Sequence, residues 1–346
     1  MSLITFIVIL YSHFRNACRL LVGKSPIPYK WLIQLTNDCN SRCESCDIWK
    51  INKNDPVKKS QESSLSDYQK FFENSGQTLR WLSLSGGEIT LFQNLGEFAS
   101  LVREYCPNLR IITFTTNGLS PEKILEIADK LQGLAKDMFI VISLDGDEKL
   151  HDQLRGVPGN YEKAHKSYQL LKDAGFTVYF GTTLNNNNHK WIEENGEKLK
   201  SVSLIHSAGI FEKNNLINDE KLAQSLKTIV KSYKIKSLSE LGEYFYLKLG
   251  IQFLRSGRKE LPIRCDSLNS SLHISPHGEI KPCMYLPAIG NIKNITLNEC
   301  LNSEEAILMR EKIAKELCPK CWMNCYAPHS ILQHPVQTLK ALTKVN

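Results

Sequence analysis

Three cysteines stand close together in the segment CNSRCESC, as Cys39, Cys43 and Cys46. Three and then two residues separate them, so a tight loop brings all three sulfur atoms within bonding reach of one metal centre. No fourth ligand follows nearby, and three protein ligands leave one coordination position free for a substrate or cofactor. The spacing therefore predicts a reactive metal site. A zinc knuckle and three structural thiols in a loop are the alternatives.

A second group of cysteines lies near the C-terminus, where residues 265–325 hold six of the eleven. Within this group, two residues separate Cys318 from Cys321, which is a metal-binding spacing. On spacing alone, structural zinc and an iron–sulfur cluster fit equally well. Three cysteines lie in apolar or helical patterns and are expected in the core: Cys18, Cys106 and Cys300.

The composition is that of a soluble globular protein. Of the 346 residues, 42% are hydrophobic and 23% are charged, which suits one large domain with a smaller one. The formal charge of +7 suits anionic substrates or a membrane surface. Nucleic acid is not an expected partner, because no block of Lys and Arg is interleaved with aromatic residues. Eleven cysteines without a cleavable signal peptide indicate a reducing, cytoplasmic location with thiols used as ligands.

The N-terminus begins with an apolar run of ten residues, SLITFIVILY, whereas a helix needs about 20 to span a bilayer. The pattern continues and predicts an amphipathic helix that ends before Gly23. In one interpretation this helix packs on the main domain. In the other, residues 1–24 make a peripheral contact with the inner face of the membrane. Arg15, Arg19 and Lys24 would then lie near phosphate headgroups.

The rest of the chain alternates apolar strands with helices. Residues 31–36 form a buried strand that runs into the first cysteine loop, and the polar residues 50–64 are expected as a surface loop. The later elements are helix 66–74, strand 80–84, helix 95–105, strand 110–115, helix 121–131, strand 138–144, helix 161–174, strand 176–183, strand 201–206, helical region 219–254 and strand 272–275. This alternation indicates a parallel α/β sheet, either closed into a full or partial barrel or open and doubly wound.

Glycines and polar residues lie where these strands end. They are Gly86, Gly87, Glu88, Asn117, Ser143, Asp145 and Thr183. Ligands of parallel α/β sheets bind at the C-terminal ends of the strands, so we expect these residues around one site. Ordinary turns are the alternative, because Asn-Gly and Asp-Gly are common turn formers. Arg155 can grip a carboxylate through two hydrogen bonds, and a surface salt bridge is the alternative for it.

The first cysteine motif resembles that of the radical S-adenosylmethionine (SAM) superfamily, in which three cysteines hold a 4Fe–4S cluster whose fourth iron binds the methionine end of SAM. The Ser-Leu-Asp-Gly segment 143–146 is also similar to the family. The residues that follow it and share the resemblance are His151, Asp152, Arg155 and Gly156. Two positions depart from the family pattern: Ser45 replaces a common aromatic residue, and Ile89 replaces the Pro that usually follows Gly-Gly-Glu.

This resemblance implies a partial (β/α)6 barrel of the radical SAM type with a SAM site at its rim. By the same resemblance the Gly-Gly-Glu motif, residues 86–88, contacts the SAM amino group. Ser143 and Arg155 bind the SAM carboxylate or ribose. Asp145 and Asn117 line the cavity, and Thr183 lies towards the adenosine end; these residues complete the expected SAM site.

The second cysteine group resembles the auxiliary-cluster region called SPASM, or its shorter form called twitch, that follows radical SAM barrels. Twelve residues separate Cys265 from Gly278, and four separate Gly278 from Cys283. A full SPASM region has seven cysteines and two clusters, so this chain is expected to hold one auxiliary 4Fe–4S cluster. Its ligands would be Cys265, Cys283, Cys318 and Cys321, with Cys325 as a substitute ligand or a spare.

The expected domain organisation has five parts. They are an N-terminal helix (1–27), a radical SAM partial barrel (28–215), a helical connector (216–260), a small cysteine-rich auxiliary-cluster domain (261–330) and a C-terminal tail (331–346).

The resemblance implies an oxidoreductase that cleaves SAM reductively to a 5′-deoxyadenosyl radical and abstracts hydrogen from a substrate. The auxiliary cluster would accept the electron left on the substrate, and a ferredoxin or flavodoxin would be the electron donor. A small-molecule, carbohydrate or lipid-linked substrate is weakly preferred. Met284 replaces the acidic residue that follows Cys283 in sulfatase-maturing relatives, and 27 N-terminal residues leave no room for a peptide-binding domain.

Three alternatives remain: a peptide-modifying radical SAM maturase, a methyltransferase or lyase of the same superfamily, and a non-catalytic iron–sulfur or zinc protein. No catalytic acid or base is assigned, although Tyr285 and His277 lie near the second cysteine group.

Overall fold

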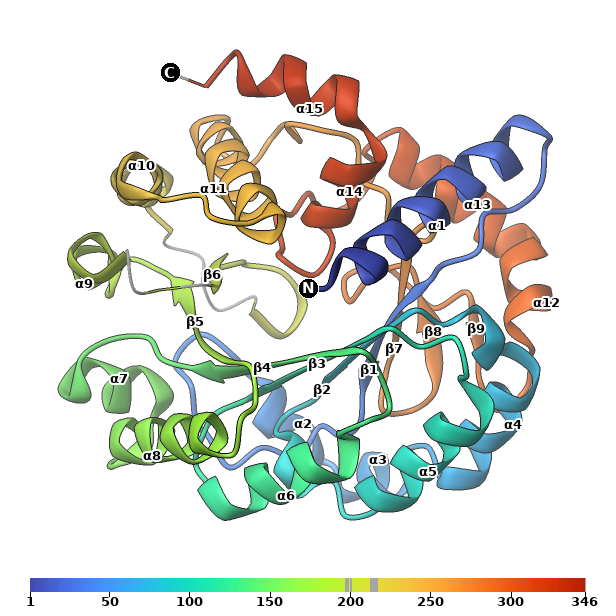
Figure 1. The fold of residues 1–346 in the computed structure, drawn as a ribbon, viewed down its shortest axis with the longest axis horizontal. Coiled ribbons are helices and arrows are strands. Elements are labelled where there is room, and N and C mark those ends of the chain that lie inside the picture. Colours follow the sequence, from blue (N-terminus) through green and yellow to red (C-terminus); the bar gives the residue numbers. More distant parts are fainter. Residues whose placement is uncertain (197–198, 200, 212–216, 346) are drawn as a thin grey trace.

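A computed structural model describes residues 1–196, 199, 201–211 and 217–345. A sheet of nine strands runs through the molecule, in the order β6-β5-β4-β3-β2-β1-β7-β8-β9 (Figure 1). The strands are β1 (Lys30–Gln34), β2 (Trp81–Ser85), β3 (Ile111–Thr116), β4 (Asp137–Ser143), β5 (Val178–Leu184), β6 (Ser201–Leu204), β7 (Ser271–Ile274), β8 (Glu279–Lys281) and β9 (Gly290–Asn291). All neighbours from β6 to β7 pair in parallel, and this confirms the predicted α/β sheet.

Four helices cover the outer side of the parallel strands: α4 (Leu65–Ser75), α5 (Leu95–Tyr105), α6 (Pro121–Leu131) and α8 (Asn160–Asp173) (Figure 1). Their apolar faces join the buried strand residues in one core, in which Tyr68 and Phe98 pack edge to face with ring centroids 5.1 Å apart. Right-handed crossovers through these helices give the predicted partial (β/α)6 barrel, with β6 as one open edge of the sheet.

The other helices are α1 (Leu3–Leu21), α2 (Ile48–Asn54), α3 (Pro56–Ser60), α7 (Glu148–Arg155), α9 (His189–Asn195), α10 (Asp219–Ser232), α11 (Leu238–Arg255), α12 (Leu297–Asn302), α13 (Glu304–Ala314), α14 (Ala327–Gln333) and α15 (Pro335–Leu342). Helices α10 and α11 correspond to the expected helical connector, and they share a second core with α9, β6 and α14. The expected C-terminal tail is the last part of α14 followed by α15.

The prediction of a surface loop over residues 50–64 was wrong, because α2 and α3 occupy most of it. Asp55 accepts a hydrogen bond from Lys58 N, and Pro56 occupies the first turn of α3. The amide of Asn52 donates to Asp38 Oδ1 (2.9 Å) and Glu62 Oε1 (2.9 Å), and this holds α2 against the segment that leads to the cysteine loop.

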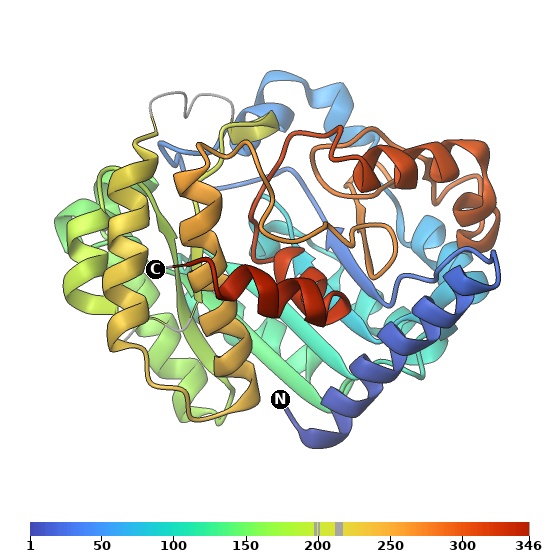
Figure 2. The same cartoon turned by 90° about the horizontal axis from the view of Figure 1, so that it is seen from above.

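Helix α1 packs across the N-terminal ends of the strands, which confirms the interpretation that places it on the main domain (Figures 1 and 2). Ser2 N donates to Asp137 Oδ1 at the start of β4 (2.9 Å), and Ile9 is buried with Tyr29 and Ile111. The opposite side of α1 presents exposed apolar side chains. No helix among the described residues is long and apolar enough to cross a membrane.

Strand β7 joins the C-terminal region to the barrel. It pairs in parallel with β1, with Trp31 opposite Leu272 and Ile33 opposite Ile274. Strands β8 and β9 continue antiparallel from it, so the sheet passes without interruption from the barrel into the C-terminal region. The two predicted cluster sites are therefore fixed to one framework.

Candidate active site

The first cysteine loop lies at the C-terminal end of β1, on a cavity of about 300 Å³. All eleven residues expected around the first cluster and SAM line this cavity: Cys39, Cys43, Cys46, Gly86, Gly87, Glu88, Asn117, Ser143, Asp145, Arg155 and Thr183. They come from the ends of β1 to β5 and from α7, because parallel strands bring their C-terminal ends to the same edge of the sheet.

Hydrogen bonds from two directions hold the cysteine loop in place. Asn117, at the end of β3, donates from Nδ2 to Asn40 Oδ1 (2.7 Å) and to Ser41 Oγ (2.9 Å). On the other side, Arg42 N donates to Arg155 O, and Glu44 N donates to Leu154 O, both at 2.9 Å. The loop that carries the three thiols is thus fixed between β3 and the C-terminal end of α7.

The Gly-Gly-Glu turn contacts the start of the cysteine loop through its backbone. Gly87 N donates to Thr36 O (2.7 Å), and Glu88 N donates to Asp38 O (2.7 Å). A Cβ atom on Gly87 would lie 2.1 Å from Asp38 O, and one on Gly86 would lie 2.8 Å from Thr36 O. The sequence interpretation assigned the close approach at these glycines to a ligand, whereas in the structure the close neighbour is the protein's own backbone.

Glu88 orders this turn. Its carboxylate is 2% exposed and accepts hydrogen bonds from Thr116 Oγ1 (2.7 Å), Asn117 N (2.8 Å) and Thr90 N (3.2 Å). Burial raises the pKa of Glu88, while the hydrogen bonds from Asn117, Thr116 and Thr90 act to lower it. Both carboxylate oxygens of Glu88 thus accept hydrogen bonds from the protein and tie this turn to the end of β3.

Arg155 and Asp145 form an ion pair inside the cavity, where only 15% and 8% of their side chains are exposed. The surface salt bridge considered for Arg155 is therefore a buried one. Asp145 also accepts a hydrogen bond from Thr183 N (2.9 Å). Burial acts to lower the pKa of Arg155, but Asp145 and Cys43 outweigh it and hold the pKa above its ordinary value.

The donor set of the cavity fits a cluster with SAM. Three thiols face it from one loop, and Arg155 Nε is buried without a hydrogen-bond partner among the described residues. A buried guanidinium donor left free in this way is suited to a carboxylate, such as that of SAM. The Ser143 side chain, 9% exposed, adds a hydroxyl to the same wall.

A second cavity, of about 20 Å³, is lined by the four thiols expected for the auxiliary cluster: Cys265, Cys283, Cys318 and Cys321. Burial, with added repulsion from Cys283 and Cys318, raises the pKa of Cys265 to about 12. Cys325 is not part of this lining and instead lines the first cavity, where its backbone oxygen accepts a hydrogen bond from Lys30 Nζ (3.0 Å). The arrangement favours Cys325 as the spare thiol.

Among the described residues, no three Cys, His, Asp or Glu side chains lie close enough together to hold a single metal ion. A 4Fe–4S cluster binds each thiolate to a different iron, so its ligands stand further apart than those of one zinc ion.

Sequence reasoning missed the residues with which the C-terminal region closes the first cavity. They are His273, Met284, Met323 and Tyr326, together with Ile210 and Phe211 from the segment after β6. No local sequence motif indicates that these residues line the cavity. They could have been predicted only if the pairing of β7 with β1 had been known. Of the two residues considered as acid or base, Tyr285 lines the second thiol cavity, and the His277 ring bonds Lys58 O (3.0 Å) outside the first cavity.

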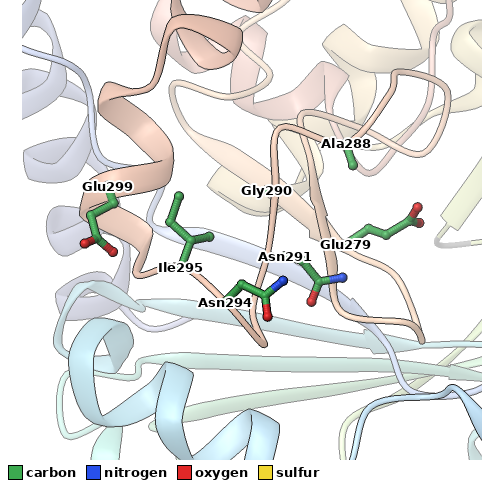
Figure 3. A pocket seen from close by; sticks show the side chains of 7 residues that line it. All are labelled: Glu279, Ala288, Gly290, Asn291, Asn294, Ile295 and Glu299. Atoms are coloured by element: carbon green, nitrogen blue, oxygen red, sulfur yellow. The ribbon is translucent and has the colours of Figure 1, made fainter.

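Another cavity, of about 740 Å³, lies at the far edge of the sheet around β9 (Figure 3). It is lined by Glu279, Ala288, Gly290, Asn291, Asn294, Ile295 and Glu299. This lining contains no cysteine and none of the predicted site residues. We therefore assign cluster and SAM binding to the two cavities that cysteines line.

Comparison with known families agrees with this geometry. Residues 33–199 match the model of the radical SAM superfamily, and residues 265–326 match SPASM, an iron–sulfur cluster-binding domain. The chain belongs to the radical SAM superfamily and carries a SPASM region. It is accordingly an enzyme whose cofactors are SAM and 4Fe–4S clusters.

Among individual relatives, the chain is 24% identical over 323 residues to the antilisterial bacteriocin subtilosin biosynthesis protein AlbA of Bacillus subtilis, covering 85% of this chain and 66% of AlbA. It is 27% identical over 165 residues to the sporulation killing factor maturation protein SkfB of the same organism, covering 47% of this chain and 38% of SkfB. An AdoMet-dependent heme synthase of Methanosarcina barkeri is 25% identical over 263 residues, which cover 69% of this chain and 73% of the synthase. The chain thus spans under two thirds of the first two relatives.

Solved structures share the fold. Native anSMEcpe with bound AdoMet and Cp18Cys peptide superposes with a TM-score of 0.59 at 13% identity, covering 92% of this chain and all (100%) of that one. Streptococcus suis SuiB bound to precursor peptide SuiA gives a TM-score of 0.59 at 15% identity, covering 89% of this chain and 74% of SuiB. The comparisons give no support to the membrane contact considered for residues 1–24.

Proposed function

We propose that this protein is a peptide-modifying radical SAM maturase. The observation that carries the proposal is the similarity to the subtilosin biosynthesis protein, which extends over 85% of this chain. The weak preference for a small-molecule, carbohydrate or lipid-linked substrate gives way to the peptide-modifying alternative. The two relatives are named for bacteriocin biosynthesis and for killing factor maturation, and the similar structure of SuiB was solved with a bound precursor peptide.

The chain's own residues supply positions and exclude water. Cys39, Cys43 and Cys46 would hold the SAM-binding cluster, while Arg155 and Ser143 would orient the SAM carboxylate. When bound, the cluster and SAM supply a 5′-deoxyadenosyl radical, which takes a hydrogen atom from the substrate. The C-terminal region covers the cavity with Met284, Met323 and Tyr326, which keeps solvent from that radical.

The four thiols of the second cavity, Cys265, Cys283, Cys318 and Cys321, would hold the auxiliary cluster. Tyr326 lines both this cavity and the SAM cavity, so the two adjoin, and an auxiliary cluster held here would suit electron acceptance from the substrate. A ferredoxin or flavodoxin would deliver the first electron.

The test is anaerobic turnover of the reconstituted protein with SAM, dithionite and a panel of synthetic precursor peptides. We expect one peptide to change mass, by loss of two hydrogens for an oxidation or cross-link, with formation of 5′-deoxyadenosine and methionine. A Cys39→Ala/Cys43→Ala/Cys46→Ala variant should give neither product. S-adenosylhomocysteine as the main product would indicate a methyltransferase instead.

A heme-type substrate is the second candidate, because the chain covers 73% of the AdoMet-dependent heme synthase. Parallel reactions with Fe-coproporphyrin III in place of the peptides separate the two. Consumption of the tetrapyrrole with no change in any peptide would overturn the peptide proposal.

A further inference from the structure

A third cavity, of about 270 Å³, adjoins the first. Four residues line both cavities: Gln34, Ile210, His273 and Met284. The two cavities therefore share part of their walls. We call the position of these four residues the neck and the third cavity the antechamber. Its walls come from the segment around α2 and α3 on the barrel side and from β7 and β8 on the SPASM side.

His273 occupies this neck from β7. It stands opposite Leu32 of β1 in the parallel register, and Leu32 also lines the SAM cavity. Side chains of register partners lie on the same face of a sheet, so the imidazole is directed to the cavity side. His273 is only 6% exposed, and its Nδ1 has no hydrogen-bond partner among the described residues.

A buried imidazole nitrogen without a partner lowers stability, and this loss is recovered when a ligand supplies the missing hydrogen bond. Burial first, and then the charge of Lys281, lowers the pKa of His273 to about 4. The neutral ring offers one N–H donor and one lone pair. A peptide backbone presents the complementary pair, a carbonyl oxygen and an N–H.

The antechamber is also polar enough for a peptide. Lys281 Nζ lies 3.3 Å from Glu279 Oε2, and Lys58 and His277 line the opposite part of the wall. Met284 and Tyr285 add apolar surface. Charged groups of both signs around a partly apolar passage suit an extended chain whose backbone and side chains alternate in polarity.

We propose that the substrate peptide reaches the SAM cavity through this antechamber, and that His273 hydrogen-bonds the peptide at the neck and orients the residue to be modified. The inference rests on the proposed function and deepens it, because it names a substrate-contacting residue that no cysteine or SAM motif includes.

The first test uses two variants at one position. His273→Leu keeps the approximate volume but removes the nitrogens, and His273→Gln keeps a donor and an acceptor. We expect His273→Leu to lower kcat/KM for the peptide about 10- to 100-fold, and His273→Gln to recover much of that loss. Iron content should stay at the wild-type level in both variants, and thermal stability should not fall below it.

The matched control is His189→Gln, because the His189 ring already bonds Asn186 O (2.8 Å) and lines neither the antechamber nor the SAM cavity. Peptide kinetics of this variant should equal those of the wild type. If His273→Leu also processes the peptide at the wild-type rate, the inference is overturned while the proposed function stands.

A second measurement does not depend on the peptide. Diethylpyrocarbonate acylates accessible neutral imidazoles, and peptide mapping by mass spectrometry reports each histidine separately. In the reconstituted protein, His273 should react, and Ile210→Trp, which fills the neck, should slow that reaction several-fold. Failure of the wild type to modify any peptide would refute the proposed function, whereas a His273 that resists the reagent would refute the antechamber.

Discussion

Arg155 Nη2 lies 2.7 Å from Asp145 Oδ2, and Nη1 of the same guanidinium lies 3.9 Å from Cys43 Sγ. One side chain thus connects the end of α7, the segment that follows β4 and the cysteine loop. The sequence analysis assigned Arg155 and Asp145 separate places in the SAM site, but the two side chains form an ion pair with each other. Asp145 therefore fixes the position of the Arg155 guanidinium. We therefore expect the position of the cluster and the binding of SAM to be coupled through this ion pair.

Arg155→Gln should weaken SAM binding about 10- to 100-fold, because a charge-assisted hydrogen bond to the SAM carboxylate is lost. It should also destabilise the fold by about 3 kcal/mol, since the Asp145 carboxylate stays buried without its partner. Isothermal titration of the anaerobically reconstituted protein with SAM measures the first effect.

A double variant separates these two effects. Arg155→Gln/Asp145→Asn removes both charges and should regain stability without regaining SAM affinity. The matched control is Arg258→Gln, which breaks another buried pair, to Asp219 (2.8 Å), away from the cavity. Wild-type SAM affinity in Arg155→Gln would contradict the assigned role.

Gly87→Ala should displace the cysteine loop, because the new Cβ would meet Asp38 O at 2.1 Å. We expect loss of the SAM-binding cluster with retention of the auxiliary one, so that iron falls from roughly eight to roughly four atoms per chain. Iron and sulfide quantitation after anaerobic reconstitution provides the measurement. Gly96→Ala in α5 is the control, since its Cβ would meet only Lys130 side-chain atoms at 3.8 Å. Equal iron content in the two variants would be evidence against this account of the glycine.

Cys325→Ala should keep both clusters, whereas Cys318→Ala should lose the auxiliary cluster. The reason is that Cys318 lines the four-thiol cavity, and Cys325 lines the SAM cavity. Iron analysis with electron paramagnetic resonance of the reduced proteins distinguishes about eight from about four irons. A drop in iron for Cys325→Ala that matches Cys318→Ala would make Cys325 a ligand. Zinc in place of iron at this site would remove its redox role.

The free energy of unfolding should decrease as the pH is lowered, because two buried histidines contact Tyr29. The Tyr29 hydroxyl lies 2.7 Å from His13 Nε2 and 2.8 Å from His329 Nδ1. Burial lowers the pKa of His13 from 6.5 to about 4, although the Gln333 side chain acts to raise it. In the unfolded chain His13 is protonated as the pH falls below about 6.5, whereas in the folded chain it stays neutral down to about pH 4. Protonation therefore favours the unfolded state, and stability is lost as the pH falls through this range.

For His13 alone, the loss between pH 7.5 and pH 5.5 is about 1.4 kcal/mol of unfolding free energy. Urea unfolding of the reconstituted protein at the two pH values gives the difference. His13→Gln, which cannot titrate, should show a smaller decrease; an unchanged decrease would assign the pH dependence to other groups.

Local patterns were sufficient for much of the fold and for the first cysteine site. The predicted bounds of α5 and α6 are those observed, because each helix combines a regular apolar face with clear end signals, such as Pro121 in the first turn of α6. The thiols at Cys39, Cys43 and Cys46 could be grouped from spacing alone, because a single loop carries all three.

Local sequence patterns could not predict contacts between distant parts of the chain. The pairing of Leu32 with His273 joins residues from opposite ends of the sequence, and no period or motif encodes it. The same pairing brings Cys325 to the SAM cavity rather than to the other thiols. Helices α2 and α3 were missed because their stability comes from Asn52 and Asp55 hydrogen bonds rather than from an apolar stripe.

The parallel pairing of β1 with both β2 and β7 also limits how the chain can be dissected. A fragment truncated before β7 would present the free edge of β1, with its apolar residues Trp31 and Ile33, to solvent. Unpaired N–H and C=O groups beside buried apolar side chains are templates for intermolecular strand addition. The barrel expressed without its C-terminal region should therefore aggregate, and the two cofactor regions should melt as one cooperative unit.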